Sequence, residues 1–156
     1  MEVDEELKQE ILARVPQQAP FRFIDEIIDI DEQKIVGAYR FREDEFFYRG
    51  HFPGYPITPG VILIETMAQI GVVAFGIYLF ACQKNMRPDK LNLPLSLFSL
   101  ADAVEFKGMV KPGERVIVKG KKIYFRKGVL KVDIVMEREK GQVVCTGKIV
   151  GVGVEK

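Results

Sequence analysis

One long apolar stretch constrains the fold of this chain more than any other feature. Residues 61–82 are apolar apart from Glu65, Thr66 and Gln69. A helix that is hydrophobic on every side has to be buried on most of its surface, either inside a large core or in a membrane. The rest of the chain must therefore supply a cover for this segment.

The ends and the polar residues of this stretch favour a protein interior. Thr58 and Pro59 are preferred at an N-cap and at the first helical position, so we expect one helix that begins there and ends near Cys82. Its length approaches the ~20 residues of a membrane-spanning helix. Glu65 and Gln69, however, would both be costly in lipid. We expect no membrane span.

The segments on either side of the helix have the pattern of strands. Residues 4–15 have the spacing of a short amphipathic helix, with Asp4 as a possible N-cap and Pro16 ending it. Runs rich in β-branched and aromatic residues, separated by turn residues, predict six strands at 21–31, 35–41, 95–106, 115–125, 129–138 and 142–152. A curved antiparallel sheet wrapped around one long helix would bury that helix, which predicts an α+β fold in a single domain over residues 1–156, with an N-terminal helix in 1–15.

Composition excludes several classes of function. The formal net charge is +1, so the whole chain offers no electrostatic argument for nucleic acid. Cys82 and Cys145 do not form a C-x-x-C pair and have no histidine cluster beside them, so neither structural zinc nor a disulfide framework is expected. Residues 1–10 are acidic and lack an apolar run, which predicts no signal peptide and a cytoplasmic location.

The chemistry of the chain centres on its single histidine. His51 lies in Gly50-His51-Phe52-Pro53-Gly54, and Glu65 follows on the predicted buried helix. An ordinary histidine side chain, with a pKa of ~6.5, is largely neutral at pH 7 and can act as a general base. Burial raises the pKa of a carboxyl group, so Glu65 could hold a proton and act as an acid. The pair suggests acid–base catalysis.

A long signature around this pair resembles a known family. The string HFPGYPITPGVILIETMAQ (residues 51–69) is similar to the active-site signature of the β-hydroxyacyl-(acyl-carrier-protein) dehydratases of the FabZ type, which are hotdog-fold lyases of fatty-acid synthesis. Residues 20–25, 104–107 and 111–114 also resemble segments of that family. The chain departs from it at 18–19 and at 99–102, which leaves acyl chain, carrier and pathway open.

The resemblance implies a role for each residue of the pair and for its neighbours. His51 would be the base, Glu65 the acid, and Gln69, one helical turn on, would orient Glu65. The carbonyl of Ile57 would orient the imidazole. Gly60 is a candidate oxyanion donor, because backbone N–H groups in a first helical turn lack partners and carry the positive end of the helix dipole. No cofactor and no metal are implied.

The resemblance also implies partners. His51 and Glu65 would meet across the interface of a homodimer, which could assemble further into a trimer of dimers. An apolar tunnel would hold the acyl chain, with Phe46, Phe47, Met67 and Phe98 as candidate wall residues. The carrier protein is acidic, so a basic run could dock it; the candidates are Lys121, Lys122, Arg126 and Lys127.

Two other functions remain open at this point. A hotdog thioesterase would also use an acidic residue on the long helix but would not need the histidine loop. A non-catalytic subunit that pairs with an active paralogue is a second alternative. The intact His51 and Glu65 weigh against the second alternative.

Overall fold

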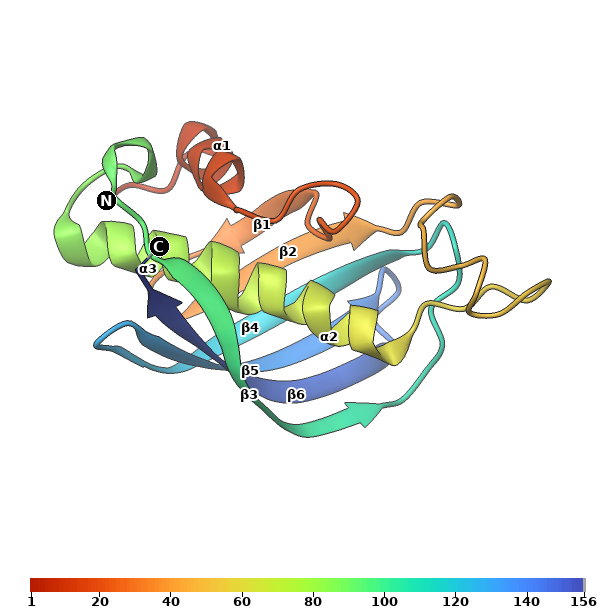
Figure 1. Ribbon diagram of the computed structural model, residues 1–156. Helices are drawn as coiled ribbons and strands as arrows, with labels where there is room; N and C mark the ends of the chain where they lie inside the picture. The colour runs from red at the N-terminus through yellow and green to blue at the C-terminus, as the bar shows by residue number, and fades with distance from the viewer. Residues whose placement is uncertain (156) are drawn as a thin grey trace.

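The structure, a computed structural model that describes residues 1–155, is built around one long helix that crosses a curved antiparallel sheet (Figure 1). The helical elements are α1 (Glu5–Arg14), α2 (Gly60–Ala68), the π-helical turn η1 (Gln69–Ala74), α3 (Phe75–Lys84) and the 3-10 turn η2 (Pro88–Lys90). The strands are β1 (Glu26–Ile30), β2 (Lys34–Arg40), β3 (Leu95–Phe106), β4 (Arg115–Arg126), β5 (Val129–Arg138) and β6 (Val143–Val154).

The sheet has the strand order β1-β2-β4-β5-β6-β3, and every neighbouring pair is antiparallel. Strand β3 follows the helix in the chain, runs along the far side of β6 and forms one edge of the sheet. Most of its side chains are exposed or only half-buried. The described part of the chain therefore leaves one edge of twelve residues uncovered.

The long helix is the core of the fold. Elements α2, η1 and α3 follow one another without a break from Gly60 to Lys84. The helix is long and apolar enough to cross a membrane, but 72% of its most apolar window is buried by the rest of the protein. It is the buried core helix that the sequence predicts, and the sheet and α1 provide its cover (Figure 1).

The start of this helix differs from the prediction. The Thr58 hydroxyl lies 2.6 Å from the hydroxyl of Tyr48, so it does not cap the helix. The carbonyl of Pro59 accepts the first helical bonds, from the N–H groups of Ile62 (2.9 Å) and Leu63 (3.2 Å). The prediction of Thr58 as N-cap is wrong because its hydroxyl is hydrogen-bonded to the buried Tyr48 and not to the helix.

The first strand is shorter than predicted. It begins at Glu26, whereas the predicted strand begins at residue 21. The backbone groups of Phe21 and Phe23 are bonded to the side chain of Gln69 on the helix, so this segment runs against the helix instead of pairing along the sheet. The N-terminal helix agrees with the prediction: Asp4 accepts a hydrogen bond from the Leu7 N–H at 2.8 Å.

Helix and sheet approach most closely at the π-helical turn. A Cβ atom on Gly71 would lie 2.5 Å from Cδ1 of Ile134 on β5, and one on Gly37 of β2 would lie 2.7 Å from Cγ2 of Ile70. Glycine at these positions lets the helix backbone rest on the sheet. Gly76, further along the helix, is different, because a Cβ there would meet only Cδ2 of Leu130 at an ordinary 3.6 Å.

This contrast predicts opposite effects of the same substitution on stability. Gly71→Leu overfills a packed contact, so we expect the free energy of unfolding to fall by ~1–3 kcal/mol. Gly76→Leu removes a flexible helix residue where space exists, so we expect no loss and a gain of up to ~1 kcal/mol. Urea denaturation of the two variants and the native protein measures both values. Equal losses in the two variants would contradict the close approach at Gly71.

Candidate active site

The loop that carries His51 is held by hydrogen bonds between its two ends. Nδ1 of His51 lies 2.9 Å from the carbonyl oxygen of Ile57, and the Ile57 N–H donates to the carbonyl of His51, also at 2.9 Å. Because a carbonyl only accepts, Nδ1 must carry a proton in this contact. The neutral ring then has its lone pair on Nε2, which is the arrangement a general base needs.

The same loop is anchored to the core just beyond Ile57. The Thr58 N–H donates to the carbonyl of Val110 at 2.9 Å, and the Thr58 hydroxyl is paired with Tyr48. Burial raises the pKa of Tyr48 to about 12, so its hydroxyl stays protonated and available as a hydrogen-bond donor. These contacts tie the His51 loop to the start of the long helix.

Gln69 holds Glu65 in place, and its own side chain is fixed by hydrogen bonds. Its side chain is fully buried, and its Oε1 accepts from the backbone N–H of Phe23 at 2.6 Å. Its Nε2 donates to the carbonyl of Phe21 at 3.0 Å and to Oε2 of Glu65 at 2.8 Å. Because the Phe23 N–H can only donate, the amide cannot be reversed. Oε1 of Glu65 is then the oxygen left to carry a proton.

The environment of Glu65 favours its protonated form. Burial raises the pKa of this carboxyl group above its ordinary value, and the hydrogen bond from Gln69 opposes part of that rise. The half-buried carboxyl group opens into a cavity of about 280 Å³. A protonated carboxyl facing an apolar cavity is suited to give its proton to a leaving group.

The cavity next to Glu65 contains one predicted tunnel residue and several that the sequence analysis missed. Phe98 lines it, whereas Met67 is fully buried elsewhere, and Phe46 and Phe47 pack edge to face next to Phe21. The other lining residues come from four separate segments: Gln17, Phe21, Ala68, Val72, Val73, Ser96, Leu97, Ile149, Val150 and Gly151. Only tertiary contacts bring these segments together, so no local pattern could have identified them.

Gln17 is a polar member of this cavity that sequence reasoning did not single out. Its Oε1 is buried, and it has no hydrogen-bond partner among residues 1–155. A buried amide oxygen without a partner is costly. It is therefore a ready acceptor for a polar group of a ligand that enters beside Glu65.

Gly60 is the first residue of α2 and lies against an aromatic ring. A Cβ atom at this position would be 2.9 Å from the ring of Phe106, so the glycine is required for packing. No hydrogen bond to its N–H is found within the described residues. Gly60 can both pack against Phe106 and donate a hydrogen bond to an oxyanion, because the packing involves its Cα and the hydrogen bond would involve its N–H.

His51 and Glu65 do not share a cavity in one chain. His51 lines neither of the two described cavities, and no hydrogen bond joins these two side chains in residues 1–155. In the same range no group of three or more His, Cys, Asp or Glu side chains could hold a metal ion. The two candidate catalytic side chains therefore do not line a common cavity within one described chain.

The predicted basic run lies far from the histidine loop of its own chain. Lys121, Lys122 and Arg126 are on β4, and Lys127 is in the turn to β5. Figure 1 shows this turn at the opposite end of the sheet from the loop before α2. Lys121 pairs across the sheet with Asp133 on β5.

The raised pKa of Glu65 predicts how a neutral replacement affects stability. When the folded-state pKa is above the unfolded-state pKa, the ionised carboxylate destabilises the folded protein. This destabilisation grows as the pH rises from the unfolded-state pKa through the folded-state pKa. Glu65→Gln removes the charge and keeps an acceptor for Gln69. We expect it to raise the melting temperature at neutral and alkaline pH, with the difference vanishing below about pH 4.

Thermal unfolding across this pH range measures the difference. Glu32→Gln, at an exposed carboxylate, is the matched control and should change little. A pH-independent effect of Glu65→Gln would contradict a buried, titrating carboxyl group.

Comparison with known proteins supports the resemblance. A family model described as a FabA-like domain matches residues 15–151. The 3-hydroxyacyl-[acyl-carrier-protein] dehydratase FabZ of Bacillus licheniformis is 32% identical over 148 residues, covering 90% of this chain and 91% of that protein. The FabZ of Yersinia enterocolitica is 34% identical over 139 residues, covering 88% of this chain and 77% of that protein.

Solved structures show the same fold. The dehydratase heterocomplex ApeI:P from Xenorhabdus doucetiae has a TM-score of 0.77 at 15% identity, with 93% of this chain and 91% of that chain covered. A hypothetical thioesterase with coenzyme A from Streptococcus pneumoniae has a TM-score of 0.58 at 10% identity, with 84% and 88% covered. The predicted hotdog fold is confirmed. The family model over residues 15–151, together with relatives above 30% identity along most of the chain, shows that this protein belongs to the FabA-like domain family.

Proposed function

We propose that this protein dehydrates 3-hydroxyacyl thioesters of acyl-carrier protein to trans-2-enoyl thioesters in fatty-acid or related lipid synthesis. The observation that carries the proposal is the Glu65 carboxyl, which burial favours in its protonated form and which Gln69 orients toward an apolar cavity. Membership of the FabA-like family and the names of the FabZ relatives support the same reaction.

The reaction follows from the atoms that these groups offer. Nε2 of His51 takes the proton from C2 of the acyl chain, because Nδ1 is engaged by the Ile57 carbonyl. Oε1 of Glu65 gives its proton to the C3 hydroxyl, which leaves as water while the C2–C3 double bond forms. The N–H of Gly60 stabilises charge on the thioester oxygen. Return of the proton from His51 to Glu65 restores both groups.

A complete site then requires two protomers. Within one described chain His51 and Glu65 line no common cavity, and β3 offers a free sheet edge with exposed apolar side chains at Leu97, Phe98 and Leu100. An uncovered apolar edge strand is a surface for pairing with another chain. We propose a homodimer with two shared sites as the catalytic unit, alone or as three dimers together.

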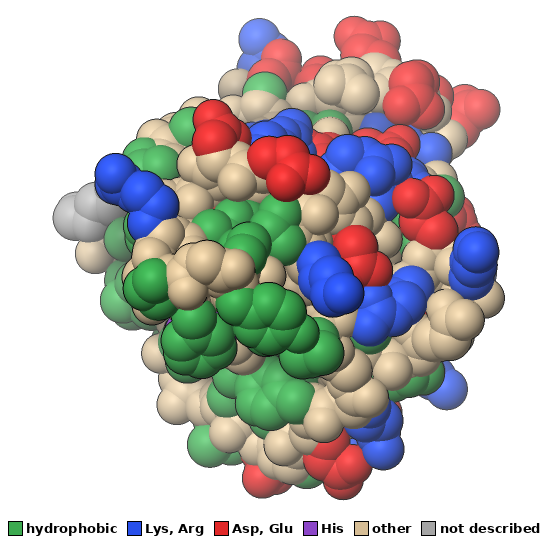
Figure 2. Space-filling model, turned by 90° about the vertical axis from the view of Figure 1, so that its right-hand side faces the viewer, with side chains coloured by type: hydrophobic (Ala, Val, Ile, Leu, Met, Phe, Trp, Pro, Cys, Tyr) green, Lys and Arg blue, Asp and Glu red, His purple; other side chains and the backbone are tan. Residues whose placement is uncertain are grey.

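The end of the molecule that carries the His51 loop supports such an interface. Figure 2 shows hydrophobic side chains gathered on this end, with lysine and arginine side chains beside them. Exposed large hydrophobic residues of the loop and the adjoining segments are Phe46, Phe52, Tyr55, Val61, Phe106 and Met109. Val61, 72% exposed near the start of a mostly buried helix, supports an interface that covers this helix start.

The carrier protein and the cellular location complete the proposal. An acidic carrier would dock on the basic surface of Lys121, Lys122, Arg126 and Lys127. This turn lies at the opposite end of the sheet from the His51 loop of the same chain. A carrier that docks there must therefore deliver its acyl chain to an active site that contains the partner's His51 loop. No membrane is required, because the apolar helix is the buried core helix, and we place the enzyme in the cytoplasm.

Substitution of either proposed catalytic residue should abolish most of the activity. We expect His51→Ala and Glu65→Gln each to reduce the rate of enoyl formation by about 10²–10⁴-fold, the usual contribution of a positioned proton-transfer group. Mass spectrometry of 3-hydroxyacyl-carrier substrates measures the product, and Glu32→Gln is the surface control. Release of free carrier thiol by the native protein, without enoyl product, would show a thioesterase instead.

Mixing the two inactive variants tests whether the sites are shared. A heterodimer of His51→Ala and Glu65→Gln chains has one site with both native groups and one with neither. After exchange of subunits at equal amounts, we expect activity to return to about a quarter of the native value, as two-fold symmetry dictates. Sedimentation should give a dimer or a multiple of it. A monomer, or a mixed sample that stays inactive after proven exchange, would contradict shared sites.

A further inference from the structure

Gln17 is a polar group of the Glu65 cavity to which the proposed reaction gives no role. Most of the residues that line this cavity are apolar, and the polar side chains among them are those of Gln17, Glu65 and Ser96. The buried Oε1 of Gln17 has no hydrogen-bond partner among residues 1–155. A polar atom left in this state beside the proposed acid points to a ligand group that completes it.

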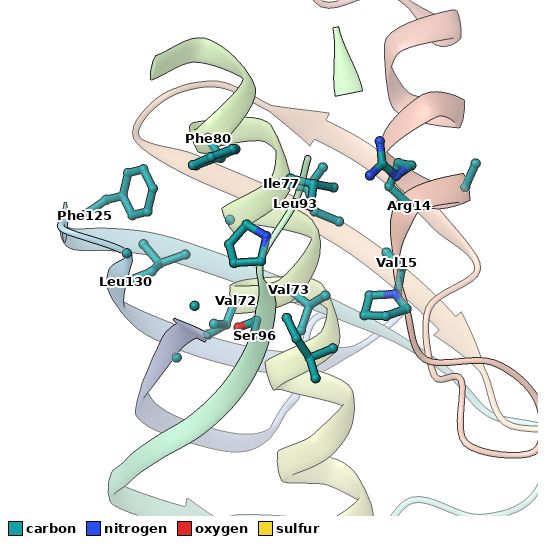
Figure 3. Close-up of a pocket in the computed structure, with 18 of the residues that line it drawn as sticks. Arg14, Val15, Val72, Val73, Ile77, Phe80, Leu93, Ser96, Phe125 and Leu130 are labelled. Atoms are coloured by element: carbon teal, nitrogen blue, oxygen red, sulfur yellow. The ribbon is translucent and has the colours of Figure 1, made fainter. Parts of the chain in front are cut away.

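A neighbouring cavity distinguishes Gln17 from Ser96. This second cavity has a volume of about 320 Å³, and Val72, Val73 and Ser96 line both cavities, so they lie at the boundary between them. Figure 3 draws Ser96 together with Val72 and Val73 among the residues of the second cavity. Gln17 and Glu65 line the first cavity alone. Gln17 is therefore the polar side chain that shares with Glu65 a place off this boundary.

The backbone of Gln17 is fixed relative to Glu65. The guanidinium of Arg22 donates to the Gln17 carbonyl at 3.2 Å and to two carbonyls at the end of α1. The carbonyl of Phe21, four residues on, accepts from Nε2 of Gln69, and the same nitrogen donates to Glu65. One chain of hydrogen bonds thus positions the proposed acid and the segment that carries Gln17.

A hydroxyl group bound beside Glu65 needs a hydrogen-bond acceptor. In the proposed reaction its oxygen receives the proton of Glu65, so one of its lone pairs faces the acid. Its own hydrogen then points into a cavity with mainly apolar walls, where an unpaired hydroxyl is costly. The amide oxygen of Gln17 can only accept, and it lacks a donor among the described residues. The substrate lacks an acceptor and the protein lacks a donor at the same place.

We propose that Oε1 of Gln17 accepts a hydrogen bond from the C3 hydroxyl of the substrate and thereby selects a 3-hydroxyacyl over a 3-oxoacyl thioester. This inference rests on the proposed dehydratase function and names a further substrate-binding residue of that site. When the C3–O bond breaks, its electron pair stays on the oxygen, which takes the proton of Glu65. Gln17 exchanges no proton and keeps its hydrogen bond to the departing water.

The selection follows from what each group at C3 can offer. A ketone has acceptors and no donor, so its oxygen would face Oε1 of Gln17 with no proton between them. A saturated carbon leaves Oε1 of Gln17 unpaired, as it is in the free protein. A site that pairs with a substrate hydroxyl discriminates against analogues that lack it, because a buried polar group is then left without a partner.

A binding experiment without turnover tests the hydrogen bond. The background is His51→Ala, which removes the proposed base and no residue of this cavity. Calorimetry compares it with His51→Ala/Gln17→Met, using acyl-carrier protein loaded with 3-hydroxyhexanoyl, 3-oxohexanoyl or hexanoyl chains. Methionine keeps the length of the glutamine side chain and has no amide oxygen. His51→Ala/Gln83→Met makes the same exchange at an exposed position of α3 and is the matched control.

The three ligands should respond with different signs. We expect Gln17→Met to weaken binding of the 3-hydroxyhexanoyl carrier by about two- to ten-fold, the usual contribution of one hydrogen bond. Binding of the 3-oxohexanoyl and hexanoyl carriers should stay equal or become tighter. The melting temperature of the free protein should not fall, because Gln17→Met removes a buried acceptor that has no partner. Gln83→Met should change none of these values.

An equal change for all three ligands would show a merely structural role for Gln17 and overturn the proposal. Unchanged binding of the 3-hydroxyhexanoyl carrier would do the same. A preference of the His51→Ala protein for the 3-oxohexanoyl carrier would also overturn it, because the amide would then present its N–H to the ligand. Failure of the native protein to form enoyl product, with the Gln17-dependent hydroxyl preference intact, would instead overturn the dehydratase function alone.

Discussion

The rest of the structure depends on the burial of one helix that is apolar on nearly every side. Neither a single sheet face nor a single neighbouring helix could cover it, so the sheet curves around it and α1 covers more of its surface (Figure 1). Glycines at Gly37 and Gly71 allow the backbones to come together where the helix touches the sheet. Strand β3, at one edge of the sheet, has exposed apolar side chains at Leu97, Phe98 and Leu100.

Placing a carboxyl group on such a helix is costly, and a hydrogen bond from Gln69 offsets part of that cost. Gln69 uses both ends of its amide on the backbone of the Phe21–Phe23 segment and still donates to Glu65. Glu65 thereby keeps a fixed orientation, while burial favours its neutral form. The shortened first strand belongs to the same arrangement, since backbone groups of Phe21 and Phe23, which precede the strand, bond Gln69 on the helix.

The proposed acid and the proposed base are held in place independently. The His51 loop is organised by its own backbone and by Tyr48, whereas Glu65 is organised by the helix and by Gln69. A two-fold assembly would need a preorganised His51 loop and a preorganised Glu65 on each chain, together with a free apolar edge. With these, it could build two identical sites.

Local patterns in the chain were enough to predict the central helix, five of the six strands within a few residues, the His51 and Glu65 pair and the family. Hydrophobic periodicity and turn residues act over short spans, and the signature of residues 51–69 is contiguous. Three features depend on contacts between distant segments: the hydroxyl of Thr58 pairs with Tyr48, backbone groups of Phe21 and Phe23 bond Gln69, and four separate segments meet around the cavity at Glu65. Hydrogen bonds and cavities of this kind arise from which surfaces pack together, and packing partners are not encoded in any local spacing.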